Sequence, residues 1–443
     1  GMGQLSKVFG KDALNTDRLT RTLGFNRLAQ ADQELLTSEY HEYLEAYSAG
    51  VNGWLQNNKL PIEFALTRIV PEPWTILDTL AWGRVMTWTL SHGWSGALTR
   101  QAIIDKVGTE MAGELSILYP ESNPFEIPLG IDVNHLEMDE MVESAPGPFL
   151  AKDMEGGGRG SNAWAISPDK TDSGRPLLCN DTHLALTCPG VWYLNQLNSE
   201  DGFHCIGSSI PGLPGLLLGH NENIAWGITL AFTDVEDVFV EKVDVANPDQ
   251  YEYKGESREF EIIEETISVK GEEDHLEKVR YTVHGPLIGS VTDNSGDAIS
   301  LCSNSLQPNS ILEGFFQINQ AKNWSEFSKG VEKIKAPQLN IVYSDIEGNI
   351  GLYISGRVPI RKNGYGNLPV PGWSGDFDWE AEIPHEEMPH VLNPDCGFVI
   401  SCNQKITDDN YEHYLGNSFM NGYRAKRIQQ RLQESDKLDI KLF

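Results

Sequence analysis

A short run of glycines separates two stretches of the chain that have different hydrophobic patterns. Residues 154–160 read MEGGGRG, and Ser161 then opens the apolar run SNAWAIS. Before the run, apolar residues recur at three- and four-residue steps, as in helices, and after it they gather in short β-rich segments. Because glycine has no Cβ, the run itself gives the backbone a freedom that other residues lack. We therefore expect a helical part and a strand-rich part, joined by an irregular segment.

The helical part is expected to span residues 1–122. Its clearest helices are predicted over residues 35–55, 71–94 and 100–118. One apolar stripe along the first of these consists of Leu36, Tyr40, Tyr43, Leu44, Tyr47, Val51 and Trp54. Such stripes are more typical of a packed core than of a cofactor site, and we interpret this one as core.

Residues 123–160 show no hydrophobic period and are rich in proline, glycine and acidic residues. A linker of about 40 residues is unusual inside a compact domain unless it is functional or disordered. We interpret this segment as a spacer that leaves or swings away when the chain is processed.

The strand-rich part is expected to span residues 161–443. Strands are predicted within residues 162–166, 176–180, 203–210, 224–229, 237–243, 260–270, 278–285, 340–356 and 397–403. The segment YSDIEGNIGLY, residues 343–353, is predicted to be a hairpin, and helices are predicted over residues 323–334 and 422–435. Because the sequence opens and closes without evident terminal elements, we expect it to be a piece of a longer protein.

The net charge argues against nucleic acids and anionic membranes as partners, whereas the cysteines leave the disulfide state open. With 34 basic and 64 acidic residues, the formal net charge is -30, which repels nucleic acids and anionic lipid. No apolar run approaches the ~20 residues of a membrane helix, and no basic-then-apolar leader opens the sequence. The six cysteines form no CxxC pair, so their spacing is compatible with free thiols or with one or two disulfides.

The position of Ser161 suggests a self-cleaving chain. Flexible glycines directly before a hydroxyl residue would let the Ser161 hydroxyl reach the carbonyl of Gly160. An N-to-O acyl shift followed by hydrolysis would then free the α-amino group of Ser161. An α-amino group has a pKa of ~7.7–8.0, so it could act as the base for the hydroxyl of its own residue. The alternative is an ordinary flexible linker that meets a strand.

Motifs along nearly the whole chain resemble the penicillin acylase family of N-terminal-nucleophile hydrolases. They are PEPWTILDTLAWGRVM in the helical part, and GSNAWAISPDKTDSGRPLLCNDTHL, PGLPGLLLGHNENIAWGIT, DVEDVFVEK, HGPLIG, NIVYSDIEGNIGLYISGRVPIR, PVPGWSGDFDW, NPDCGFVISCNQKI and GYRAKRI in the strand-rich part. The resemblance implies an α+β fold, a four-layer αββα sandwich wrapped by a helical subunit segment. It further implies an α/β heterodimer cut from one precursor, and a periplasmic or secreted location.

The resemblance also assigns roles to individual residues. Ser161 matches the nucleophile, and the Gly160–Ser161 bond matches the bond that is cut. The other matches are His183 beside the nucleophile, the backbone N–H of Leu230 and the side-chain amide of Asn403 as oxyanion donors, and Arg424 as the group that steadies the amine. Without the resemblance, His183 would be interpreted as a structural residue and Asn403 as a turn cap. Arg427 is an alternative to Arg424, or else it pairs with surface acids.

Two groups of residues could hold a metal ion. Family members often hold a structural calcium where this chain has Asp234, Glu236 and Asp237, and carboxylates suit that ion. However, Ala97 stands where the helical subunit would supply a further glutamate, so a solvated acidic turn is the alternative. Separately, the crowding of Cys179, Asp181, His183 and Cys188 could in principle hold zinc, although the spacing matches no established zinc motif.

The positions that match the acyl pocket of the family are Leu184, Leu218 and Ile228. All three are apolar, and each buried methylene of a substrate would contribute ~0.8 kcal/mol. We therefore expect an amidohydrolase for N-acyl compounds with hydrophobic acyl groups, such as penicillins or N-acyl-homoserine lactones, that needs no cofactor for its chemistry. The alternatives are a non-catalytic binding or scaffold protein of the same fold and a zinc-dependent hydrolase.

Overall fold

A computed structural model describes residues 1–91, 93–115, 119–120, 122–127, 160–184, 187–200, 202–292, 298–309, 311–441 and 443. Most of the predicted spacer, residues 128–159, lies outside the described residues. The helices are α1 (Ser6–Phe9), α2 (Leu14–Leu23), α3 (Phe25–Leu35), α4 (Ser38–Asn57), α5 (Ile62–Thr67), α6 (Ile76–Leu90), α7 (Trp94–Val107), α8 (Thr109–Glu114), α9 (Ile311–Gln320), α10 (Trp324–Lys333) and α11 (Tyr423–Gln433).

The strands begin at the glycine that precedes Ser161. They are β1 (Gly160–Ile166), β2 (Leu177–His183), β3 (Tyr193–Asn198), β4 (His204–Ile210), β5 (Leu213–Asn221), β6 (Ile224–Leu230), β7 (Glu236–Val240), β8 (Gln250–Tyr253), β9 (Glu256–Glu259), β10 (Glu261–Ile267), β11 (His275–Thr282), β12 (Gly285–Pro286), β13 (Ile299–Ser303), β14 (Leu339–Asp345), β15 (Ile350–Ile354), β16 (Pro359–Arg361), β17 (Val370–Pro371), β18 (Trp379–Glu382), β19 (His390–Leu392) and β20 (Phe398–Ser401).

Local sequence signals set several helix ends. Thr75 and Asp78 form a reciprocal capping box at the start of α6, and the Asn323 side chain accepts the Glu326 N–H at the start of α10. The single helix predicted over residues 100–118 is instead divided into α7 and α8 at Gly108, whose φ of 84° is outside the helical range. Because glycine tolerates this conformation, the helix is interrupted here even though the hydrophobic pattern of the sequence continues.

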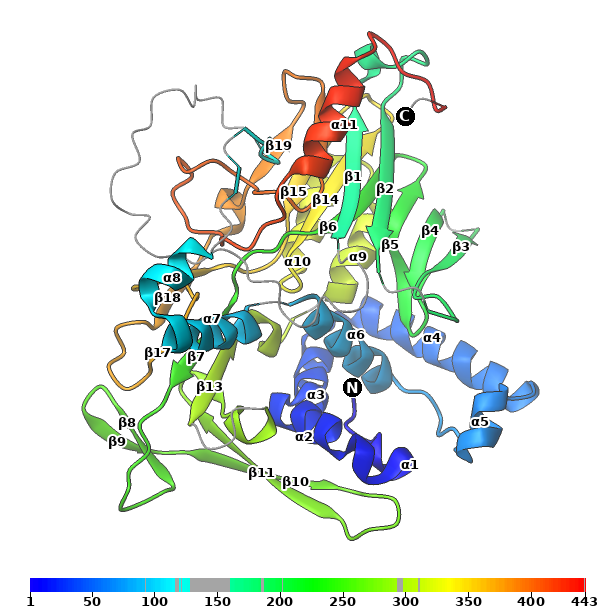
Figure 1. Cartoon of the computed structure of the whole chain (residues 1–443). Coiled ribbons are helices and arrows are strands. Elements are labelled where there is room, and N and C mark those ends of the chain that lie inside the picture. The colour runs from blue at the N-terminus through cyan, green and yellow to red at the C-terminus, as the bar shows by residue number, and fades with distance from the viewer. Residues whose placement is uncertain are drawn as a thin grey trace.

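The strand-rich part forms four layers (Figure 1). The central sheet is antiparallel, with the order β19-β15-β14-β6-β5-β4-β3. Helices α9 and α10 pack on one face of it, while the smaller sheet β2-β1-β20 packs on the other and is itself covered by α11. The predicted αββα sandwich is therefore confirmed, and β1, which carries Ser161, lies between its two neighbours inside the sandwich.

The core lies between α9, α10 and the central sheet. Its fully buried aromatic side chains come from both layers: Trp226, Tyr343, Phe315 and Phe327. The predicted hairpin at residues 343–353 is the β14–β15 turn, where Gly348 has φ of 99°. A glycine there supplies the positive φ that the tight turn requires.

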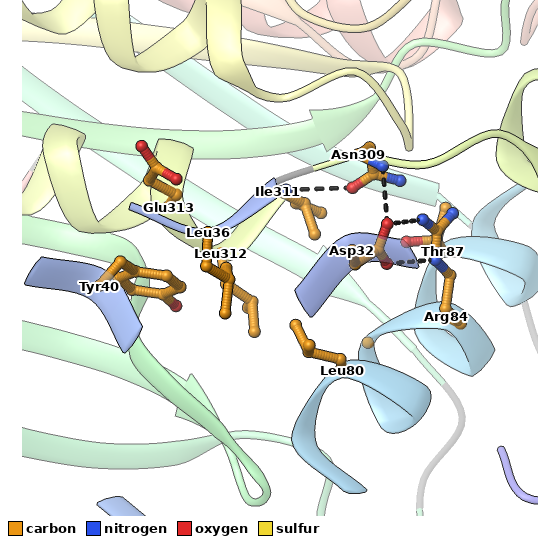
Figure 2. Close-up of a pocket in the computed structure, with 11 residues that line it drawn as sticks. Asp32, Leu36, Tyr40, Leu80, Arg84, Thr87, Asn309, Ile311, Leu312 and Glu313 are labelled. Carbon is orange, nitrogen blue, oxygen red and sulfur yellow. Dashed lines mark hydrogen bonds and ion pairs between the residues drawn. The ribbon is translucent and has the colours of Figure 1, made fainter. Parts of the chain in front are cut away.

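A buried ion pair attaches the helical part to the strand-rich part (Figure 2). Asp32 of α3 accepts the Arg84 Nε–H of α6 at 2.6 Å and the backbone N–H of Asn309 at 2.8 Å. The Arg84 Nη1 group donates to the carbonyls of Ser305 and Gln307 at 3.0 and 2.8 Å. Burial raises the pKa of Asp32, although Arg84 opposes the shift.

Two further observations concern the helical part and the predicted spacer. Tyr40 and Leu44 of the predicted stripe are buried, but Trp54 near the end of α4 is 47 % exposed. The first residues of the predicted spacer are packed rather than loose, since Glu126 and Ile127 donate backbone N–H groups to Lys405 and Ile406. Among the helices of the described residues, none is long and apolar enough to span a membrane.

Candidate active site

Ser161 lies near the start of β1 and is almost completely buried. Its hydroxyl donates to the carbonyl oxygen of Gly160 at 2.6 Å, and its backbone N–H donates to Asn403 Oδ1 at 2.7 Å. The peptide group that is predicted to be cut therefore has a polar partner at each end: its oxygen accepts a hydrogen bond from the Ser161 hydroxyl, and its N–H donates to the Asn403 amide oxygen.

Asn403 follows β20 and is held by its side-chain amide and its backbone carbonyl. Its Nδ2 donates to the Leu230 carbonyl at 2.8 Å, and its own carbonyl accepts the Met420 N–H at 2.8 Å. The residue is fully buried and has φ of 64°, a left-handed conformation that asparagine tolerates better than most residues. This conformation lets the chain leave the strand while the amide stays beside Ser161.

Arg424 is in the first turn of α11, where it joins the two strands that flank the site. Its Nη2 donates to Asn403 Oδ1 at 2.9 Å, and its Nη1 donates to the Ser161 carbonyl at 2.6 Å and to Asn162 Oδ1. Arg427, the alternative, is exposed and pairs with Glu434 at 3.6 Å. The structure therefore brings Arg424, and not Arg427, to Ser161.

His183 ends β2 and is directly opposite Gly160 in the β1–β2 pairing. Its Nε2 lies 2.8 Å from Asp181 Oδ2 and 3.4 Å from Asn162 Nδ2, and its side chain is partly exposed. The imidazole ring therefore lies beside Asp181 and Asn162, one residue from Ser161 along β1.

The positions predicted to form the acyl pocket lie on neighbouring elements. Leu218 of β5 and Ile228 of β6 belong to the same hydrophobic cluster, in which Ile228 is buried and Leu218 partly buried. Leu184 follows the end of β2 and is partly buried. The cavity of Figure 2 is a different feature, because Asp32, Arg84 and Leu312 line it between the helical part and α9.

The acidic residues of the DVEDVF motif do not fit a calcium site. The buried guanidinium of Arg361 lies against two of them, with its Nε 2.8 Å from Asp237 Oδ2 and its Nη2 3.4 Å from Asp234 Oδ1. Glu236 instead accepts the Ser303 hydroxyl and the Trp94 N–H. Burial raises the pKa of Asp234, which Arg361 opposes, and raises that of Glu236 to about 7.

The described residues also give no support to a zinc site. They contain no group of three or more histidine, cysteine, aspartate or glutamate residues that could hold a metal ion. All six cysteines are described, and all are free thiols. Asp181 binds His183 alone among the four candidate ligands.

Several residues that support the site were not predicted from the sequence. The Asn180 side chain joins the two sheets, since its Nδ2 donates to the Asn162 and Ile228 carbonyls and its Oδ1 accepts the Ile228 N–H. Asn340 is fully buried in β14, within the apolar segment LNIVYSD. An amide side chain among the apolar residues of a predicted strand is the sequence signal that could have drawn attention to it.

The geometry suits acyl transfer at a chain terminus. Cleavage after Gly160 would leave the Ser161 nitrogen as an amine beside Asn403 Oδ1, next to its own hydroxyl. The Asn403 amide and the end of β6 lie together, as an oxyanion site of one side-chain donor and one backbone donor requires. One buried residue would then carry both the nucleophile and its base.

Comparisons with known proteins place the chain among acylases. The chain is 31% identical to the acyl-homoserine lactone acylase QuiP of Pseudomonas aeruginosa, over 97% of this chain and 52% of that protein. It is 32% identical to the penicillin acylase 2 proenzyme of Pseudomonas sp. strain SE83, over 98% of this chain and 57% of that protein. The chain thus spans about half the length of these curated relatives.

A solved structure and a family model extend the comparison. A thermostable penicillin G acylase from Alcaligenes faecalis matches with a TM-score of 0.56 and 26% identity, over 63% of this chain and 50% of that one. The model of the penicillin amidase family matches residues 1–443. The chain therefore belongs to the penicillin amidase family.

Proposed function

We propose that this protein is an amidohydrolase that removes hydrophobic acyl groups from N-acyl compounds through an acyl-enzyme on Ser161. The observation that carries the proposal is the pair of contacts at one residue, the Ser161 hydroxyl on the Gly160 carbonyl and the Ser161 nitrogen on Asn403 Oδ1. The names of the relatives, acyl-homoserine lactone acylase and penicillin acylase, supply the two substrate classes.

Activation begins with the chain itself. The Ser161 Oγ attacks the Gly160 carbonyl carbon, the peptide C–N bond breaks, and the nitrogen takes the hydroxyl proton. This step yields an ester between Gly160 and Ser161 and a free α-amine. Water then hydrolyses the ester, which leaves a carboxylate on Gly160 and a free hydroxyl on Ser161. Arg424 holds the Ser161 carbonyl throughout, so the new terminus stays in place.

Turnover repeats the same chemistry on a substrate. The α-amine of Ser161 accepts the proton of Oγ as Oγ attacks the substrate carbonyl, and the oxyanion receives hydrogen bonds from Asn403 Nδ2 and the Leu230 N–H. The protonated amine then donates to the leaving nitrogen, and water releases the acyl group by the reverse route. Leu218 and Ile228, from adjacent strands, offer apolar surface for the acyl chain.

The two products of cleavage are proposed to stay together as a heterodimer. Arg84 and Asp32 of the helical part bind backbone groups of Ser305, Gln307 and Asn309 in the strand-rich part. These bonds are remote from the cleaved bond in sequence and do not depend on it. The resemblance to the family further leads us to propose a periplasmic or secreted location, which cell fractionation would test.

Hydrolysis assays with a graded series of acyl chains test the proposed function. We expect the purified protein to release amine from N-acyl-homoserine lactones or phenylacetyl amides, and Ser161→Ala to abolish both chain cleavage and turnover. A Ser161→Ala chain that is cleaved and active would refute the mechanism. A folded wild-type protein that is neither cleaved nor active would instead indicate a binding member of the fold.

A further inference from the structure

A buried glutamate lies behind the oxyanion positions. Glu126 lies near the start of the segment predicted to be a spacer, and only 3 % of it is exposed. A role in the mature enzyme requires that Glu126 stays with the folded protein when the rest of the spacer is released. Its Oε1 accepts the Ser401 hydroxyl at 2.7 Å and the Asn340 Nδ2–H at 3.0 Å. Its Oε2 is buried and has no hydrogen-bond partner among the described residues. Burying a carboxyl group with one oxygen unpaired costs folding free energy.

The partners of Glu126 connect the strands that carry the two oxyanion donors. Ser401 is the last residue of β20 and precedes Asn403 by one turn residue. Thr229 precedes Leu230 in β6, and its hydroxyl oxygen lies 2.5 Å from that of Ser401 and 3.0 Å from Asn340 Nδ2. The group of Glu126, Asn340, Thr229 and Ser401, here called the polar junction, therefore joins β6 to β20 directly beside Leu230 and Asn403.

The backbone holds Glu126 in the same place. Its N–H donates to the Lys405 carbonyl at 3.0 Å, and the next residue, Ile127, donates to the Ile406 carbonyl at 2.8 Å. These carbonyls follow Asn403 closely in the chain. The side chain of Glu126 thus binds Ser401, before Asn403, and its main chain binds Lys405, after Asn403.

We propose that Glu126 is a positioning residue of the acylase site, whose carboxyl group sets the spacing of the Leu230 and Asn403 oxyanion donors through Ser401 and Asn340. The inference rests on the proposed function, because it names a further residue of the same site. Glu126 touches no reacting atom and acts through the polar junction.

The surroundings of Glu126 favour the neutral form of its carboxyl group. Burial raises its pKa well above the ordinary value, and the Ser401 hydrogen bond opposes the shift. The titratable groups that face it are the Tyr119 phenol and the Cys402 thiol, and burial raises the pKa of both, that of Cys402 to about 12.

The nearby cations are engaged elsewhere. The Lys405 ammonium pairs with Asp409, and Arg424 is bound to Asn403 and Ser161. Oε1 accepts two hydrogen bonds, so in the neutral form the proton would sit on Oε2. Ionisation at high pH would place an unpaired charge in the junction and disturb the donors that it holds.

A raised pKa of Glu126 makes the stability of the folded protein depend on pH. A carboxyl whose pKa is raised in the folded state is protonated there while it is ionised in the unfolded chain. Between the ordinary carboxyl pKa and the raised one, the folding equilibrium constant therefore falls as pH rises, by about tenfold per pH unit for this single proton. A glutamine at this position has no such proton and should remove this dependence.

The test compares three variants of the protein. Glu126→Gln keeps the acceptor for Ser401 and Asn340, Glu126→Ala removes it, and Glu110→Gln, at an exposed glutamate of α8, is the matched control. For each we would measure release of the Ser161 terminus, kcat and KM for an N-acyl substrate from pH 6 to 10, and urea unfolding over the same range.

We expect Glu126→Ala to lower kcat about 100-fold with little change in KM, since misplaced oxyanion donors affect the transition state. Glu126→Gln should have a kcat within a few-fold of wild type at pH 7. Its kcat should begin to fall only at a higher pH than that of wild type, and its free energy of unfolding should depend less on pH. The control should match wild type throughout.

The outcomes that overturn the inference differ from those that overturn the function. If wild type is cleaved and active but Glu126→Ala keeps kcat within threefold, or Glu126→Gln leaves the alkaline limb unmoved, the positioning role is wrong and the function stands. If Glu126→Ala fails to fold, the pH profile of Glu126→Gln decides. If wild type neither cleaves nor hydrolyses, the proposed function fails and the inference fails with it.

Discussion

Changing Asn403 to aspartate would separate its two roles at Ser161. The amide oxygen accepts the Ser161 N–H and an Arg424 N–H, while the amide nitrogen donates to the Leu230 carbonyl and would donate to the oxyanion. A carboxylate keeps the acceptor, removes the donor to the Leu230 carbonyl and to the oxyanion, and adds a negative charge beside Arg424. Aspartate also tolerates the left-handed backbone at this position, where φ is 64°.

The expected magnitude follows from the groups that lose partners. Removing one oxyanion donor costs about 2.7–4 kcal/mol of transition-state stabilisation, or a factor of about 10²–10³ in kcat. Asn403→Ala would add further losses, because the Ser161 N–H and an Arg424 N–H would stay buried without an acceptor, each at a cost of about 1–3 kcal/mol. Asn403→Asp keeps an acceptor for these two groups, but it turns a carboxylate toward the Leu230 carbonyl and the oxyanion, so the loss in kcat should be at least that of the missing donor.

The assay is hydrolysis of an N-acyl substrate by cleaved, folded enzyme. We expect Asn403→Asp to reduce kcat by at least about 10² while KM changes by a few-fold at most, as for an interaction made only in the transition state. Asn198→Asp, at the exposed end of β3, is the matched control and should behave as wild type. A cleaved Asn403→Asp enzyme with kcat within threefold of wild type would refute the assignment of Asn403.

Three further predictions concern the rest of the fold. Arg84→Met leaves Asp32 buried without its partner and should lower the free energy of unfolding by about 3–5 kcal/mol in urea titrations; an unchanged midpoint would contradict the role of this pair. Arg361→Leu should be similarly destabilising, whereas EGTA should leave the melting temperature of the wild type unchanged, and a fall on chelation would restore the calcium interpretation. Gly160→Ala would place a Cβ 3.0 Å from Arg424 Nη2 and should slow the appearance of the Ser161 terminus about tenfold by gel; cleavage at the wild-type rate would show that the space at this position is not needed.

The sequence predicted those features that depend on neighbouring residues. The β14–β15 hairpin at residues 343–353 follows from its turn residues, and the change from helical to strand patterning places the start of β1 within one residue of its observed start at Gly160. Gly108 shows a limit of this reasoning, since a continued helical period hid the break between α7 and α8. The family resemblance, and not the pattern, was needed to pick out Asn403.

The features that the sequence did not predict depend on contacts between distant segments. Arg361 lies far from Asp234 and Asp237 in the chain, so an acidic motif that resembled a calcium site could not reveal its cation. Glu126 lies in a proline-rich stretch that resembles a linker, yet it pairs with Ser401 and Asn340. Local patterns carry no information on such pairings, because they are fixed only when the sheets pack together.

The most direct test of the account is the intact mass and N-terminal sequence of the purified, active protein. The account predicts two chains, with the second beginning SNAWAIS at Ser161, and a single uncut chain without activity for Ser161→Ala. An active enzyme whose chain is continuous through Gly160 and Ser161 would contradict it.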